Sequence, residues 1–124
     1  MESLSALVRP PGTSFPKAVS SHPQKSGIDY EKALSQHRHY VDALKQMGCR
    51  ILSLPPEDSL PDSTFVEDTA FIYGTKAFLC SAKEESRRNE VESVAKVLKD
   101  HREIRQLEPY LDGGDILNTP EAIF

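Results

Sequence analysis

The acidic segment from Leu60 to Asp68 is the part of the sequence best suited to do chemistry. Three carboxylates, those of Asp62, Glu67 and Asp68, lie within seven positions of each other. Carboxylates held together raise one another's pKa unless a cation relieves them. A planar guanidinium suits such a group because it offers several donors in a fixed fork, and Phe65 could pack against its flat face. A solvated acidic loop is the alternative interpretation.

A second candidate is the stretch Asp-Gly-Gly-Asp at residues 112–115. The two glycines allow the backbone to turn sharply or to approach a ligand closely. The flanking acids, Asp112 and Asp115, could bind a metal, orient a histidine or simply form a turn.

A third candidate is the basic start of a predicted helix, Ser86-Arg87-Arg88. An arginine here could hold the carboxylate of a ligand. The alternative is a solvated first helical turn. Basic residues are unfavourable at a helix N-terminus, which favours a functional or tertiary reason for them.

The cysteines and histidines offer little for catalysis or metal binding. Cys80 follows an apolar run and is predicted to be a packed strand residue, and Cys49 is predicted to be structural. His37 and His39 lie on opposite sides of a predicted helix without a ligand partner at a spacing of four, which argues against a zinc site. The sequence also contains no glycine-rich phosphate loop and no G-x-S-x-G nucleophile motif.

Strands and helices alternate along the chain, which indicates an α/β protein. A helix is predicted from Asp29, which can cap it, to Met47, with Gly48 as a left-handed C-terminal cap. Gly74 and Thr75 fit a tight hairpin with glycine first. A second helix is predicted over residues 86–100. The predicted strands cover residues 4–8, 50–54, 69–73, 76–80, 104–107, 115–118 and 121–124, the last two forming a hairpin around Thr119-Pro120.

An internal repeat is predicted within this order. Residues 65–79 align without gaps on residues 110–124, at an offset of 45 positions. A fixed period indicates supersecondary units that bury their faces by stacking on one another. Two hairpins that share a pattern by chance are the alternative. The Pro- and Ser-rich loop over residues 10–27 is long for a small domain, so it is functional or disordered.

Composition excludes several classes of protein. The chain has 124 residues and a formal net charge of −4, which suits a single domain and argues against nucleic acid or an anionic membrane as partner. No apolar run approaches the roughly 20 residues of a membrane-spanning helix. The N-terminus does not resemble a signal peptide, and the two cysteines suggest no disulfide framework, so a cytoplasmic location is expected.

Taken together, the motifs resemble those of dimethylarginine dimethylaminohydrolases, members of the guanidino-group-modifying (pentein) superfamily. The resemblance covers nearly all of the chain but only about the N-terminal half of a family member. It rests on residues 62–68 (Asp-Ser-Thr-Phe-Val-Glu-Asp), 86–90 (Ser-Arg-Arg-Asn-Glu) and 111–115 (Leu-Asp-Gly-Gly-Asp), and extends to Val8-Arg9 and to residues 29–37.

The resemblance implies a β/α propeller of five ββαβ modules, of which a 45-residue period would place about 2.8 in this chain as one incomplete domain. It also implies hydrolysis of methylated arginine to citrulline and a methylamine, with a link to nitric oxide regulation. In such enzymes a cysteine thiolate attacks the guanidinium carbon and a histidine protonates the leaving amine. No cofactor and no metal are implied, and the expected partner is a small cationic guanidino substrate.

The resemblance also assigns roles to individual residues. Asp62, Glu67 and Asp68 would bind the guanidinium and α-amino ends of the substrate, and Arg87 its α-carboxylate. Asp112 would take the place of the acid that orients the catalytic histidine. The loop over residues 10–27 would be a lid, with Val19 where family members commonly have a leucine.

The sequence departs from the family pattern in two ways. Residues 81–85 read Ser-Ala-Lys-Glu-Glu where the family usually has an Arg-Pro-Gly stretch. The family's catalytic histidine and cysteine correspond to positions beyond Phe124. We therefore expect the 124-residue chain to be inactive alone, and an incomplete propeller to self-associate through strand edges and apolar faces.

Two other functions fit the sequence. An arginine deiminase or amidinotransferase would share the fold and differ at the ends of the substrate. A non-catalytic α/β binding or interaction module would need no further residues.

Overall fold

The computed structural model describes residues 4–19 and 27–124. The chain forms two compact units, residues 1–64 and residues 65–124. In the described residues, no helix is both long enough and apolar enough to cross a membrane.

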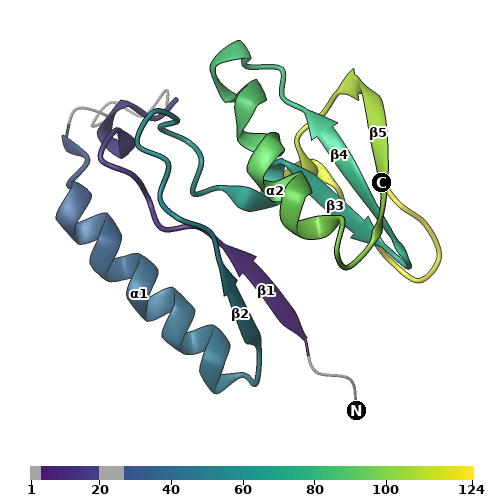
Figure 1. The fold of residues 1–124 in the computed structure, drawn as a ribbon, viewed down its shortest axis with the longest axis horizontal. Coiled ribbons are helices and arrows are strands. Elements are labelled where there is room, and N and C mark those ends of the chain that lie inside the picture. The colour runs from purple at the N-terminus through teal and green to yellow at the C-terminus, as the bar shows by residue number, and fades with distance from the viewer. Residues whose placement is uncertain (1–3, 20–26) are drawn as a thin grey trace. The chain divides into compact units, whose positions relative to one another are not determined.

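The first unit is a two-stranded parallel sheet with one long helix beside it (Figure 1). Strands β1 (Ser5–Val8) and β2 (Arg50–Ser53) pair in register from Ser5–Arg50 to Val8–Ser53. Helix α1 (Tyr30–Gln46) connects them and contacts β2. A short 3₁₀ turn, η1 (Phe15–Lys17), follows β1.

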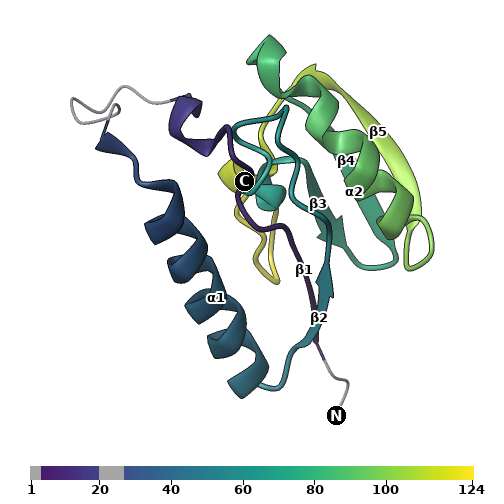
Figure 2. The same cartoon turned by 60° about the vertical axis from the view of Figure 1, so that its left-hand side comes forward.

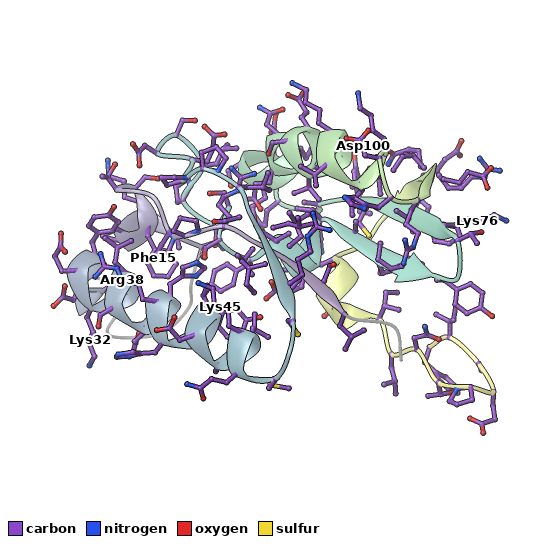
Figure 3. All side chains as sticks on the ribbon, turned by 60° about the horizontal axis from the view of Figure 1, so that its bottom comes forward. Phe15, Lys32, Arg38, Lys45, Lys76 and Asp100 are labelled. Atoms are coloured by element: carbon purple, nitrogen blue, oxygen red, sulfur yellow. The ribbon has the colours of Figure 1, made fainter. Side chains whose placement is uncertain are left out.

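Both predicted caps of α1 are confirmed. Oδ1 of Asp29 accepts the backbone N–H of Lys32 at 3.1 Å, which satisfies one of the unpaired donors of the first turn. Gly48 has φ = 88°, the left-handed conformation that ends a helix at low cost for glycine alone. No residue of α1 is fully buried, and its solvent face carries charged side chains such as Lys32 and Lys45 (Figure 3).

The second unit is a three-stranded sheet with helix α2 (Val91–Leu98) lying along one face (Figure 2). The strands are β3 (Ala70–Tyr73), β4 (Lys76–Ser81) and β5 (Glu103–Tyr110), in that order across the sheet. β3 and β4 form an antiparallel hairpin, whereas β4 and β5 are parallel and joined through α2. Gly74 has φ = 59° in the hairpin turn, as the prediction requires.

The core of the second unit lies between α2 and β4. Ala77, Leu79 and Cys80 of β4 and Val94 of α2 are buried. The prediction that Cys80 packs within a strand is therefore confirmed. Large apolar side chains elsewhere in this unit remain exposed, among them Tyr110, Leu117 and Phe124. Whether the chain self-associates through them stays a prediction, as do the repeat and the single-domain organisation.

The predicted helix over residues 86–100 is wrong at both ends. A 3₁₀ segment, η4 (Glu85–Glu90), replaces its first part, and only Val91–Leu98 is α-helical. The expected strand over residues 104–107 is longer, since β5 runs to Tyr110. Pro109 is tolerated there because β5 lies at the edge of the sheet.

The hairpin predicted for the last ten residues is present only as a single bridge. Residues 113–115 form a 3₁₀ turn, η5 (Gly113–Asp115), and an isolated antiparallel bridge joins Asn118 to Ile123. The backbone N–H of Thr119 donates to the carbonyl of Ala122 at 2.9 Å, so the turn lies one residue later than predicted. The predicted loop over residues 10–27 is described only to Val19 and at Gly27, and the rest lies outside the described residues.

Candidate functional site

Arg87 is the centre of a polar cluster in the second unit. Its Nε and Nη2 donate to Oε2 and Oε1 of Glu90 at 3.1 and 3.0 Å, a two-point contact. Its Nη1 donates to Oδ2 of Asp68 at 3.1 Å. The side chain of Arg87 is 11% exposed and that of Glu90 only 2%, so this three-residue network is largely withdrawn from water.

The local backbone explains the contact between Arg87 and Glu90. The two residues are three positions apart in η4, and side chains at that spacing eclipse one another in a 3₁₀ helix. Burial lowers the pKa of Arg87, but hydrogen bonds and charge from Glu90 and Asp68 outweigh burial and raise it. The guanidinium is therefore charged and held on two sides.

Phe65 lies over the same guanidinium. Its ring centroid is 5.9 Å from Cζ of Arg87, at the outer limit of a cation–π contact. Phe65 therefore contacts a guanidinium within the protein, and its expected packing on a ligand stays a prediction.

The two acidic motifs, predicted from segments far apart in the sequence, lie against each other. Glu67 and Asp68 belong to a 3₁₀ turn, η3 (Val66–Asp68), which contacts η5. A Cβ on Gly113 would meet the carbonyl oxygens of Glu67 and Ala70, the latter at 2.7 Å. A Cβ on Gly114 would collide with Oδ1 of Asp68. Gly113 is thus required by close approach of the backbone, and Gly114 leaves room for the side chain of Asp68.

A small pocket opens beside this junction. Its volume is about 10 Å³, enough for about one water molecule. The lining includes Asp68, Arg87 and Asp112, with Cys80 from β4. Burial, with smaller contributions from the charges of Asp112 and Asp68, raises the pKa of the Cys80 thiol to about 11. The predicted site residues Asp68, Arg87 and Asp112 are therefore brought together, with a neutral thiol next to them.

The side chain of Glu67 is more exposed to solvent than that of its neighbour Asp68. Glu67 is exposed, whereas Asp68 is half-buried and paired with Arg87. Because Glu67 is exposed, its carboxylate can bind a cation from solvent directly. Asp68 would first have to give up its contact with Arg87.

Asp62 and Val19 meet in the first unit. The backbone N–H of Val19 donates to Oδ2 of Asp62 at 3.1 Å. Asp62 is 5% exposed and Val19 52% exposed. The contact ties the described end of the predicted lid loop to one of the predicted substrate-binding acids.

Arg9 braces the segment that carries Asp62. It is 1% exposed, and its Nη1 donates to the carbonyl of Pro55 at 2.8 Å. Its own carbonyl accepts the Oγ1 hydroxyl of Thr64 at 2.8 Å. The sequence motifs do not reveal this role.

Glu90 is the site residue that sequence reasoning missed, although a signal for it was present. In the predicted second helix Glu90 is four positions before Val94, on the same face as that apolar residue. A carboxylate on an apolar helix face needs a buried partner, and Arg87 is three residues earlier.

Comparisons with known proteins agree with the resemblance. A family profile described as "N,N dimethylarginine dimethylhydrolase, eukaryotic" matches residues 13–119. A dimethylarginine dimethylaminohydrolase of Streptomyces coelicolor is 35% identical over the whole of this chain, which covers 49% of that enzyme. The chain thus spans about half the length of the curated relatives it matches.

Solved structures share the fold. A cysteine-to-serine mutant of the Pseudomonas aeruginosa dimethylarginine dimethylaminohydrolase, complexed with citrulline, matches with a TM-score of 0.92 and 28% identity. The match covers 99% of this chain and 49% of that one. The N-terminal domain of a cyanobacterial arginine dihydrolase, bound to product, matches in fold with a TM-score of 0.78 and 19% identity, over 94% of this chain and 45% of that one.

The α/β fold is therefore part of a pentein propeller, as the resemblance implied. With a family profile over most of its length and a relative at 35% identity, the chain belongs to the dimethylarginine dimethylaminohydrolase family.

Proposed function

We propose that this chain forms the substrate-binding half of a hydrolase that converts methylated arginine to citrulline and a methylamine. The observation that carries the proposal is the packing of Gly113 and Gly114 against Glu67 and Asp68. It gathers the two acids of η3 and the acidic loop at Asp112 around one place in the second unit. Carboxylates so arranged suit a planar cation.

The proposed roles follow the charges. Asp62, Glu67 and Asp68 bind the guanidinium and α-amino ends of the substrate, as the resemblance implies. Arg87 binds the α-carboxylate. Asp112 orients a histidine that another part of the full-length enzyme supplies. The relative from Pseudomonas aeruginosa, solved with citrulline, supports a small guanidino-derived ligand.

The 124-residue chain alone is inactive in this proposal. Covalent attack on a guanidinium carbon needs a thiolate. The Cys80 thiol is buried, and its pKa of about 11 keeps it protonated at neutral pH. Both cysteines are free thiols, which fits a reducing, cytoplasmic location.

Titration calorimetry tests binding. The chain should bind NG,NG-dimethylarginine and fail to bind norleucine, which has the same α-amino acid end but no guanidinium. Equal binding of the two ligands, or binding of neither, would contradict the proposal. Stronger binding of arginine than of dimethylarginine would favour the deiminase alternative.

A citrulline assay tests the chemistry. The chain alone should form no citrulline from dimethylarginine, and a fusion to the second half of the Streptomyces coelicolor relative should form it. Turnover by the chain alone, or none by a correctly folded fusion, would count against the proposed division of roles.

A further inference from the structure

The strongest unassigned feature is the buried carboxylate of Glu90. Its side chain is 2% exposed, and it receives two hydrogen bonds from one guanidinium. A carboxylate so far withdrawn from water is stable only when paired and hydrogen-bonded. If Arg87 turned away, Glu90 would be left buried without its principal partner. Glu90 therefore holds Arg87 strongly in its present orientation.

Glu90 itself is fixed by a rigid element. It immediately precedes α2, whose residue Val94 is 2% exposed and lies in the core of the unit. Helix α2 packs on β4. The position of the Glu90 carboxylate is thus set by the packing of a helix on a sheet, which is a firmer base than a loop provides.

Arg87 in turn constrains Asp68, which belongs to the acidic turn η3. Arg87 Nη1 binds Oδ2 of Asp68 at 3.1 Å, and Oδ1 of Asp68 lies against Gly114. One oxygen of the Asp68 carboxylate is therefore bound by a cation, and the other lies close to Gly114. A pair of hydrogen bonds in a fork fixes orientation as well as distance, which a single point charge does not.

We infer that Glu90 is a positioning residue for guanidinium binding: through Arg87 it fixes the orientation of the Asp68 carboxylate. The inference rests on the proposed function for its effect on a ligand. It requires no contact between Glu90 and that ligand. Its consequence is that loss of Glu90 disturbs Asp68, although Asp68 lies nineteen positions before Arg87 in the chain.

The first test is spectroscopic and needs no ligand. The ¹³Cγ signal of Asp68 at neutral pH should move in Glu90→Gln, which keeps the size of the side chain and removes its charge. It should move as well in Arg87→Lys, which cannot form the fork. The matched control is Glu92→Gln, the same change at an exposed position of α2, which should leave the signal in place.

The second test is a double-mutant cycle on binding of decarboxylated NG,NG-dimethylarginine, which lacks the α-carboxylate that Arg87 is proposed to bind. Glu90→Gln should weaken binding about tenfold, because a charge-assisted contact that fixes Asp68 is lost. In an Asp68→Asn background the same change should cause little further loss, since the two residues act as one unit. Glu92→Gln should leave the dissociation constant unchanged.

These outcomes separate the inference from the proposed function. An unmoved Asp68 signal in a folded Glu90→Gln variant overturns the inference, whatever the ligand does. An equal loss of affinity in the wild-type and Asp68→Asn backgrounds overturns it too. If the wild-type chain binds no dimethylarginine, the proposed function fails, and the Asp68 signal alone decides the role of Glu90. Should Glu90→Gln not fold, Glu90→Asp takes its place: it keeps the charge and shortens the reach to Arg87, so it should move the Asp68 signal, and an unmoved signal overturns the inference.

Discussion

The backbone N–H of Val19 donates to the carboxylate of Asp62, across 43 positions of the chain, at 3.1 Å. Asp62 is almost fully buried and Val19 is exposed, so this contact is partly shielded from water. The resemblance assigned the two residues separately, to a lid and to a substrate contact. The structure joins them by a direct hydrogen bond.

Replacing Asp62 by Ala should therefore release the amide of Val19. Native-state hydrogen exchange at Val19 should become faster, because its acceptor is removed. A second carboxylate offers the reciprocal control: Oδ1 of Asp58 accepts the backbone N–H of Thr13 at 2.8 Å. Asp58→Ala should speed exchange at Thr13 and not at Val19. Unchanged exchange at Val19 in Asp62→Ala would show that the hydrogen bond does not protect this amide.

Substituting Gly113 by Ala should destabilise the second unit. The added Cβ would meet the backbone carbonyls of Glu67 and Ala70, and backbone atoms move less readily than side-chain ends. Overpacking of this kind costs about 1–3 kcal/mol. Chemical denaturation measures the loss. Gly27→Ala is the control, since a Cβ there meets nothing within 4 Å. Equal stability of the two variants would mean that η3 and η5 are not packed this closely.

The Cys80 thiol should titrate near pH 11. The ¹³Cβ NMR signal of Cys80, measured in a cysteine-labelled Cys49→Ser background, follows this one group. Burial is the main cause of the raised pKa, and Asp112 adds to it, so Asp112→Asn should lower the pKa. A thiol that titrates at its ordinary value of 9.0 would contradict the described surroundings of Cys80.

The same shift predicts how stability depends on pH. The folded state favours the neutral thiol, so the unfolded state loses its proton first, near pH 9.0, and the folded state only near 11. The free energy of unfolding of the wild type relative to Cys80→Ala should be constant below pH 9.0 and decline as the pH rises towards 11. A difference that stays constant over this range would contradict it.

Local signals in the sequence sufficed for much of the fold. Asp29 and Gly48 define the ends of α1 through their own backbone preferences, and Gly74 defines the β3–β4 turn in the same way. These residues need no distant partner. The helix prediction failed at residues 86–90, which form a 3₁₀ segment. There Arg87 pairs with Asp68 from another element, and helix propensity takes no account of such a distant contact. The strand prediction failed after Gly113, where close packing on η3 takes the place of a strand.

Only part of the candidate site could be recognised in the sequence. The acidic and Asp-Gly-Gly-Asp motifs stand out by composition, but their contact depends on glycines whose close approach only the structure shows. Individual roles for Asp62, Asp68 and Arg87 came from family resemblance. Glu90 was missed because only residues 86–88 of η4 were considered as a candidate site, whereas the buried side chain is that of Glu90, at the end of η4.

Glu67 provides the most direct test of the central claim, that this chain binds a guanidinium through the acids of η3. Glu67 is exposed, so Glu67→Gln should leave the fold intact and remove one charge from the site. Titration calorimetry with NG,NG-dimethylarginine should show affinity reduced about tenfold or more, the effect of losing a hydrogen bond to a charged group. Glu92→Gln should bind as the wild type does. If Glu67→Gln and the wild type bind dimethylarginine equally well, the assignment of the site is wrong.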